Sequence, residues 1–310
     1  MIRIPFREFE TIQKELQRLD SLPKRDVAAL MAPLAVPGAK VVLSSAPSLS
    51  YLGGVPRLPE SCPWPTVDGC ELDFIGRLSL SMLNRVAPID WLPKTGALLF
   101  FYYVPGGYEL GPPENRAWAV LHVPDLAEPL EDGQPEVSPG LRLPHRNVEF
   151  RRINSYPSPE RPTVKALELE GREWESYFEI CDEMFGSDPK HQIGGFPSPV
   201  LSDDMEPRVQ LYSHGHSSCA EVREGAKNWR LLFQFDLYSS FGDESEGLSK
   251  DDKAFAYFWI EEAAARVANF ENVWFSFQET VAAVGLVSAQ TGQTLKTYED
   301  VPSMSWPLQR

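Results

Sequence analysis

Two glycine pairs, each followed by the same order of apolar segments, constrain the fold of this chain most strongly. The pairs stand in Gly53-Gly54-Val55-Pro56 and Gly194-Gly195-Phe196-Pro197. Three strand-like segments follow each pair, centred on Phe74, Phe100 and Val120 and then on Phe233, Phe258 and Phe275. Their spacings are 26 and 20 residues in the first set and 25 and 17 in the second. Such agreement predicts one structural unit used twice.

The remaining pattern is that of a mixed fold with a large core. Of 310 residues 43% are hydrophobic, which is enough to cover both faces of a substantial sheet. Amphipathic spacing predicts helices over Phe6–Leu19, Arg25–Leu34 and Glu173–Phe185. Strands are expected over Lys40–Leu43, Leu72–Leu80, Ala97–Val104, Trp118–Val123, Val148–Ile153, Arg230–Leu237, Ala254–Ile260 and Asn272–Glu279. The predicted class is α+β, rich in β-strand and internally duplicated, with N-terminal helices. Ala254–Ile260, apolar on both faces, should be central.

Proline content indicates where the two halves divide. Eleven of the 28 prolines lie between Pro105 and Pro162, which predicts loops and edge strands there. A polar loop is expected between the second glycine pair and the strand that starts at Arg230. The predicted organisation is N-terminal helices in 1–38, a first half in 39–153, a connection in 154–172, a second half in 173–280 and a C-terminal extension in 281–310. Both halves are expected to form one compact domain.

Charge and cysteine content narrow the classes of function. The chain has 44 acidic and 29 basic residues and a net charge of −15, which repels nucleic acid and favours encounter with a basic protein. No apolar run reaches the roughly 20 residues of a membrane helix, and Met1–Leu16 lacks a signal-peptide core, so cytoplasmic residence is expected. Four cysteines without C-x-x-C spacing predict reduced thiols, mostly buried.

The short motifs do not predict catalysis. Neither glycine pair matches a dinucleotide or P-loop pattern, so tight turns are the favoured role of Gly53, Gly54, Pro56, Gly194, Gly195 and Pro197. His214, His216 and Cys219 are candidate metal ligands, but no second close-spaced ligand pair accompanies them. The acidic groups near Asp203 and Asp243 lack an EF-hand register, so solvated acidic loops are expected there. No serine stands in a nucleophile elbow. We therefore predict no catalytic residue, metal or cofactor.

Polar residues in or beside apolar strands are the candidate ligand-binding residues, because burial of an unpaired polar group is costly. These are Arg77, Gln234, Asp236 and Asp243, together with His191 before the second glycine pair. Two explanations stay open. The side chains form hydrogen bonds to loop backbone or to one another, or they bind a ligand.

The motifs around both glycine pairs resemble the YwqG-like family of bacterial proteins of unknown function. The first set is Gly53-Gly54-Val55-Pro56-Arg57-Leu58-Pro59 with Trp64-Pro65 and Phe74-Ile75-Gly76-Arg77-Leu78. The second set is His191-Gln192-Ile193-Gly194-Gly195-Phe196-Pro197, Leu231-Leu232-Phe233-Gln234-Phe235-Asp236 and Phe241-Gly242-Asp243. The resemblance implies an α+β fold with internal duplication and, because some members lie near toxin genes, an immunity role. Tyr51 and Gln192 replace a common lysine and Arg77 a common glutamine, which suggests that any shared polar site is altered here.

These observations favour a cytoplasmic protein-binding module, an immunity protein that covers the active surface of a basic bacterial toxin. The expected contact loops are Leu201–Glu206, His214–Ser218 and Asp243–Asp252. The alternative is a small-molecule-binding protein or enzyme with a pocket between the halves, lined by Arg77, His191, Gln234 and Asp236. A scaffold subunit is a third possibility.

Overall fold

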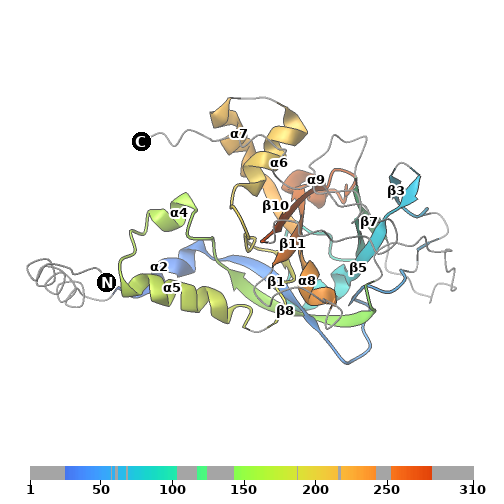
Figure 1. Ribbon diagram of the computed structural model, residues 1–310, viewed down its shortest axis with the longest axis horizontal. Helices are drawn as coiled ribbons and strands as arrows, with labels where there is room; N and C mark the ends of the chain where they lie inside the picture. The colour runs from blue at the N-terminus through green and yellow to red at the C-terminus, as the bar shows by residue number, and fades with distance from the viewer. Residues whose placement is uncertain are drawn as a thin grey trace, which may run out of the picture.

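A ten-stranded antiparallel sheet organises the molecule (Figure 1). The computed structural model describes residues 25–102, 117–123, 143–241 and 253–280, except 57, 60, 61, 68, 187, 216 and 217. The strands are β1 Val36–Leu43, β2 Tyr51–Leu52, β5 Asp73–Ser79, β6 Ala97–Tyr102, β7 Trp118–Val123, β8 Arg146–Ser155, β9 Gln192–Gly194, β10 Trp229–Asp236, β11 Ala254–Glu261 and β12 Trp274–Glu279. A separate hairpin pairs β3 (Thr66–Val67) with β4 (Cys70–Glu71). The predicted β-rich α+β class is confirmed.

Short helices surround the sheet. They are α2 Val27–Met31, α3 Leu80–Val86, α4 Pro162–Lys165, α5 Arg172–Glu183, α6 Met205–His214, α7 Cys219–Ala226, α8 Leu237–Phe241 and α9 Glu262–Arg266, with a 3₁₀ turn, η1, at Ala32–Leu34. Helices α2, α4 and α5 share a small core of their own around Met31, Val164 and Tyr177. The helix predicted over Phe6–Leu19 and the extension 281–310 lie outside the described residues.

The strand order has the same form when traced from either edge. From one edge it runs β7, β6, β5, β2, β8, and from the other β12, β11, β10, β9, β1. We call β2, β5, β6 and β7 the first wing, and β9, β10, β11 and β12 the second wing. Strands β1 and β8 pair at the centre, from Val36 opposite Ser155 to Leu43 opposite Val148. Because β1 precedes the first wing but pairs with β9, and β8 precedes the second wing but pairs with β2, the wings are linked by exchanged strands.

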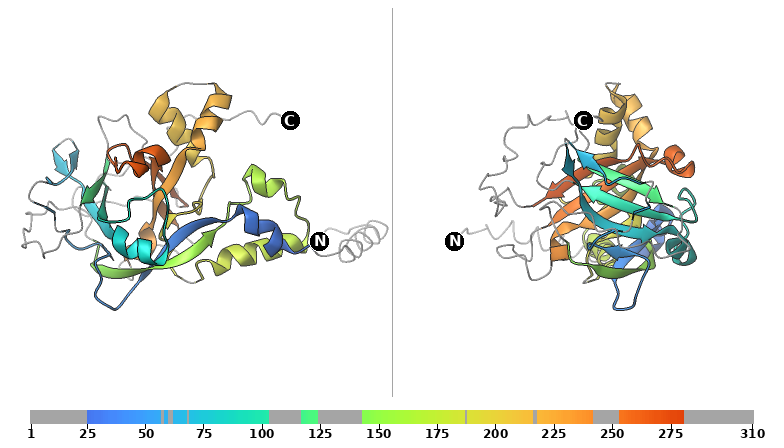
Figure 2. Two further views of the ribbon diagram at one scale, coloured as in Figure 1. Left: turned by 180° about the vertical axis from the view of Figure 1, so that it is seen from behind. Right: turned by 90° about the vertical axis from the view of Figure 1, so that its right-hand side faces the viewer.

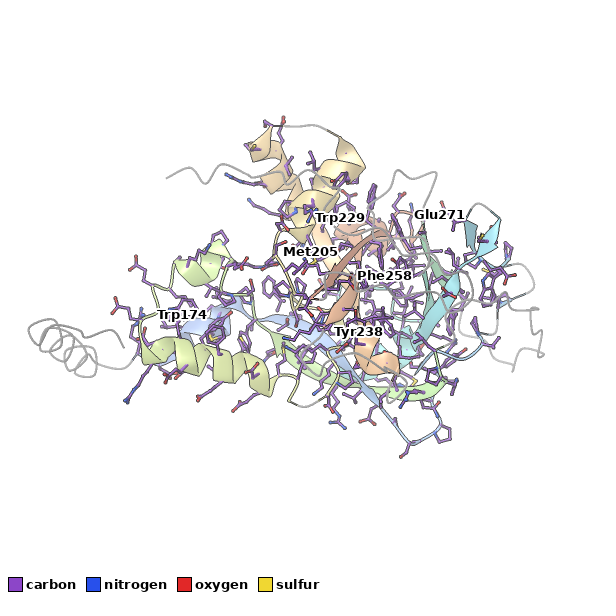
Figure 3. The ribbon with its side chains drawn as sticks, in the orientation of Figure 1. Trp174, Met205, Trp229, Tyr238, Phe258 and Glu271 are labelled. Carbon is purple, nitrogen blue, oxygen red and sulfur yellow. The ribbon has the colours of Figure 1, made fainter. Side chains whose placement is uncertain are left out.

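The two wings face each other across an aromatic core (Figure 2). Phe100 on β6 lies with its ring centroid 4.7 Å from Phe233 on β10 and 5.1 Å from Phe258 on β11. Tyr102 stacks on Phe275 at 4.3 Å. Figure 3 shows Phe258 in the middle of this core. Strand β11 lies between β10 and β12 and is buried on both faces, as its sequence predicts.

Trp118 joins the wings through a hydrogen bond as well as through packing. Its indole Nε1–H donates to the buried carbonyl oxygen of Val273 at 2.8 Å. Trp118→Phe should lower the free energy of unfolding by about 1 to 3 kcal/mol, because the carbonyl is left without its donor. Urea denaturation measures this. The control is Trp174→Phe, at a partly buried indole with no such bond in the described part of the chain; an equal loss there would contradict the prediction.

The glycine pairs are turns that allow close approach of the backbone to the two ends of β8. Gly53 has φ +61°, and a Cβ there would lie 2.3 Å from the carbonyl oxygen of Pro144. Gly195 has φ +76°, and a Cβ there would lie 2.5 Å from the Cβ of Ser155. Gly54 and Gly194 also have positive φ, and Pro56 and Pro197 that follow are buried. A side chain at either turn would therefore displace β8.

Several expectations from the sequence are wrong. Strand β8 lies in the proline-rich region expected to contain loops and edge strands, but it is a central strand of the sheet, between β1 and β2. The region expected to be a polar loop before β10 contains α6 and α7, because Met205 and Val209 bury one face of α6 and a capping box between Ser218 and Glu221 starts α7. The cysteines are not mostly buried. Cys70 and Cys219 are exposed, on the surface hairpin and at the start of α7, while Cys62 and Cys181 are half-buried; all four are free thiols.

Candidate functional site

A cluster of buried polar side chains lies where β9 meets β10, in the second wing. Gln192 and Gln234 are opposite each other in the two strands, and both are completely buried. His191 immediately precedes β9 and is also buried, while Asp236 ends β10. The structure thus brings together three of the predicted ligand-binding residues, His191, Gln234 and Asp236.

His191 is held as a neutral imidazole. Its Nδ1 accepts a hydrogen bond from the backbone N–H of Asp236 at 3.0 Å, and its ring stacks on Phe235 with centroids 5.1 Å apart. Burial lowers the pKa of His191 to about 4, although the Asp236 carboxylate acts in the opposite direction. The proton of the neutral ring therefore resides on Nε2, since Nδ1 is an acceptor.

Three glutamines fasten the loop that follows the second glycine pair. Gln192 Nε2 donates to the carbonyl oxygens of Gly194 and Phe196. Gln234 Oε1 accepts from the N–H of Ser198 at 2.7 Å, and its Nε2 donates to the carbonyl of Lys190. Gln278 on β12 accepts from the N–H groups of Val200 and Leu201 and donates to the Ser202 carbonyl. The side-chain amides of these glutamines thus make the hydrogen bonds that water would otherwise make with the backbone of this loop, which lies across the strands.

Asp236 acts as a helix cap. Its Oδ1 accepts from the N–H of Ser239 at 3.2 Å, at the start of α8, and its Oδ2 accepts from the N–H of Lys190. Ser79 has the same role in the first wing, where its hydroxyl accepts from the N–H of Met82 at the start of α3. The local contacts of Gln234 and Asp236 are thus with backbone, the first of the two explanations left open by the sequence.

Arg77 lies on β5, in the first wing, whereas this cluster lies in the second wing. Its Nη1 donates to the carbonyl oxygen of Leu49, and its backbone pairs with Tyr51 on β2. Asp243, the remaining candidate, lies outside the described residues.

A small cavity lies beside the cluster, between β8 and α8. Its lining residues are Leu43, Leu52, Leu143, Pro144, Arg146, His191, Ser239 and Ser240. Only His191 among these is a predicted ligand-binding residue. Arg146 and the two serines were missed because an arginine at a strand start and serines after a strand are ordinary surface residues. The available signal was the pair Ser239-Ser240 directly after the capping Asp236.

A buried ion network involves the loop expected to be a solvated acidic segment. Arg161 donates to both carboxylate oxygens of Asp203 at 2.5 Å and to Glu206 at 2.8 Å. Ser158 also donates to Asp203, whose side chain is only 1% exposed. Burial raises the pKa of Glu206, with Arg161 acting in the opposite direction. These carboxylates are therefore occupied inside the molecule, and the expectation of a solvated loop is wrong.

Among the described residues there is neither a metal-binding cluster nor a membrane-spanning helix. No three His, Cys, Asp or Glu side chains of the described residues gather in a way that would hold a metal ion. Nε2 of His214 instead lies 3.4 Å from Oε1 of Glu261. Cys219 is the first residue of α7, and His216 lies outside the described residues. None of the described helices has the length and apolar character that crossing a bilayer requires.

The structure is that of a β-rich α+β protein in which two four-stranded wings are joined by the central strands β1 and β8. The model of a family described as a domain of unknown function, DUF1963, matches residues 50–278, so the chain belongs to this family. The match begins just before β2 and ends within β12, and it therefore includes both wings. No curated protein matches the sequence.

Proposed function

We propose that this protein is a cytoplasmic protein-binding module that recognises a basic partner through the exposed face of α5. The observation that carries the proposal is Phe178, which is 49% exposed on this helix. Exposed carboxylates surround it on the same helix: Glu175, Glu179, Asp182 and Glu183. An aromatic side chain within an acidic rim is the arrangement expected of an anchor for a basic protein surface.

Phe178 is held in place before any partner binds. Its ring stacks on Trp174 with centroids 6.0 Å apart and meets Tyr177 edge-on at 5.4 Å. Tyr177 is itself buried, and its hydroxyl donates to the carbonyl of Pro157. A rigid aromatic anchor loses little conformational entropy on association, which favours affinity.

The α5 face replaces the loop Leu201–Glu206 as the proposed contact surface. The carboxylates of Asp203 and Glu206 are paired with Arg161, so this loop offers no free negative charge from them. On that side of the molecule Leu201 and Tyr212 are exposed. Of the other expected loops, Asp243–Asp252 lies outside the described residues.

We further propose that the partner is a bacterial toxin, which the protein neutralises by occluding its active surface. The net charge of −15 supports a basic partner. The resemblance to the YwqG-like family, some members of which lie near toxin genes, supports the toxin. The test is co-expression with toxin candidates encoded beside this gene, followed by survival and pull-down assays. Rescue and capture by at least one candidate are expected, and failure with all of them would contradict the proposal.

Phe178→Ala should weaken binding to such a toxin at least tenfold, or about 1.4 kcal/mol, because the anchor is lost while the helix is kept. Tyr212→Ala, which removes a comparably exposed aromatic ring on α6, is the matched control. Titration calorimetry compares the two. Loss of binding in Tyr212→Ala but not in Phe178→Ala would place the interface on α6 and exclude α5.

We also infer that the wings arose by duplication of one unit. In support, Tyr51 precedes Gly53 by two residues and pairs with Arg77, while Gln192 precedes Gly194 by two and pairs with Gln234. The register shifts of the two wings fall at corresponding points, between Phe74 and Gly76 in β5 and between Leu231 and Phe233 in β10. Alignment of the halves across other family members should match Arg77 with Gln234. A consistent match in another register would contradict duplication.

A further inference from the structure

Helix α5, which lies at one end of the molecule (Figure 1), carries a charge pattern that disfavours the helix itself. It contains five acidic residues and one basic residue, Arg172 at its start. Glu175, Glu179 and Glu183 follow one another at intervals of four residues, a spacing at which like charges repel. Asp182 and Glu183 stand in the last turn, which has no basic residue, although the helix dipole disfavours carboxylates there. Such a conflict with local stability is expected where a bound cation offsets it.

Most of this charge is not neutralised within the described part of the chain. Glu173 is the exception, since Arg25 forms an ion pair with it. The other four carboxylates of the helix are exposed and form no ion pair with a described residue: Glu175, Glu179, Asp182 and Glu183. Beyond the end of the helix, Lys40 lies over the Phe185 ring, but its ion pair is with Asp188 at 2.6 Å. The negative charge of α5 therefore faces a cation that the described residues do not supply.

The exposed ring of Phe178 lies among these carboxylates. Residues three and four positions apart are neighbours on a helix, so Glu175 and Asp182 flank Phe178, one turn before it and one turn after it. Trp174, which Figure 3 labels, stacks on the same ring with an interplanar angle of 30°. An aromatic face attracts a cation through its quadrupole, and a carboxylate accepts charge-assisted hydrogen bonds from one. This helix face combines both kinds of attraction.

We propose that the α5 face binds an arginine side chain of its protein partner, whose guanidinium stacks on Phe178 and donates hydrogen bonds to the carboxylates beside it. A guanidinium is planar and weakly hydrated, so it stacks on a ring while its N–H groups point sideways toward carboxylates. A lysine ammonium is compact and strongly hydrated, so it pairs with a carboxylate but gains less from the ring. This inference rests on the proposed function of α5 and names the group that α5 recognises.

Titration of the whole ¹⁵N-labelled chain with capped triarginine and, separately, with capped trilysine tests the proposal, because the two peptides carry the same charge. The backbone amide resonances of α5 report the binding. The dissociation constant should be lower for triarginine by about threefold or more. Phe178→Leu keeps an apolar side chain but removes the ring, so this preference should disappear. Tyr212→Leu removes a comparably exposed ring on α6, is the matched control, and should keep the preference.

A measurement on the wild type keeps the proposal testable if a variant fails to fold. Dimethylation of a guanidinium keeps its charge but blocks its paired hydrogen bonds, so a tripeptide of dimethylarginine should bind α5 more weakly than triarginine. Equal affinity for triarginine and trilysine, a preference that persists in Phe178→Leu, or resonance shifts that avoid α5 would each overturn the proposal.

None of these titrations uses a toxin, so the two proposals fail separately. Failure of every toxin candidate to bind would contradict the toxin partner, while the arginine preference of α5 would still be measured. Conversely, capture of a toxin by a chain that binds triarginine no better than trilysine would contradict only the arginine assignment.

Discussion

Replacement of Arg161 by methionine is expected to lower the free energy of unfolding by about 3 to 5 kcal/mol. In the wild type, the Arg161 guanidinium neutralises two carboxylates, Asp203 and Glu206, whose side chains are 1% and 14% exposed. Methionine retains much of the packing volume but leaves both carboxylates without their cation. Removal of one partner of a buried ion pair is far more costly than removal of an exposed one, because the charge that remains cannot reach water.

Urea denaturation of Arg161→Met and of Arg230→Met compares a buried with a partly exposed ion pair. Arg230 bridges Glu262 at 2.6 Å, but both side chains are about a third exposed, so that variant should lose at most about 1 kcal/mol. The deficit of Arg161→Met should also shrink as the pH falls. Burial already raises the pKa of Glu206, and loss of Arg161 raises it further, so protonation removes the unpaired charge early. A deficit as small as that of Arg230→Met would contradict the prediction.

The ion network around Arg161 also shows why some elements of this fold can be predicted from the sequence and others cannot. Strands such as β7 and β11 follow from continuous apolar and aromatic runs, and their predicted limits agree with the structure to within two residues. Helix α6 buries only Met205 and Val209, so its periodicity is weak, and the acidic residues at its start suggest a loop. Whether Asp203 is solvated or buried depends on Arg161, 42 residues earlier in the chain.

The exchange of β1 and β8 between the wings could not be predicted, because neither strand carries a signal for its partner. Val41 and Phe150 would be buried by any neighbouring strand, and the sequence distance between them exceeds the reach of local rules. The candidate site shows the same limit. Burial of Gln234 in an apolar strand predicts that its amide needs hydrogen-bond partners. Those partners are the N–H of Ser198 and the carbonyl oxygen of Lys190, and they are set by where the loop crosses the strands.

Acidification should destabilise the wild type between pH 6.5 and 4 through His191. Its pKa falls from 6.5 in the unfolded chain to about 4 in the folded protein, because burial disfavours the imidazolium. Above pH 6.5 the ring is neutral in both states, and its contribution to stability is fully present. Between the two values only the unfolded chain binds the proton, so stability is lost as the pH falls. The loss amounts to about 3 kcal/mol at pH 4, and it levels off within about one pH unit below that, once the folded protein also binds the proton.

His191→Asn should remove most of this loss. An asparagine Oδ1 is able to accept from the N–H of Asp236 as Nδ1 does, so the variant is less stable at neutral pH mainly through loss of stacking on Phe235. His214→Asn, at a half-exposed histidine, is the control for removal of one imidazole. Denaturation at pH 7 and at pH 4 compares both variants with the wild type. If His191→Asn loses as much stability as the wild type over this interval, the imidazole is not the buried neutral group that the Asp236 hydrogen bond implies.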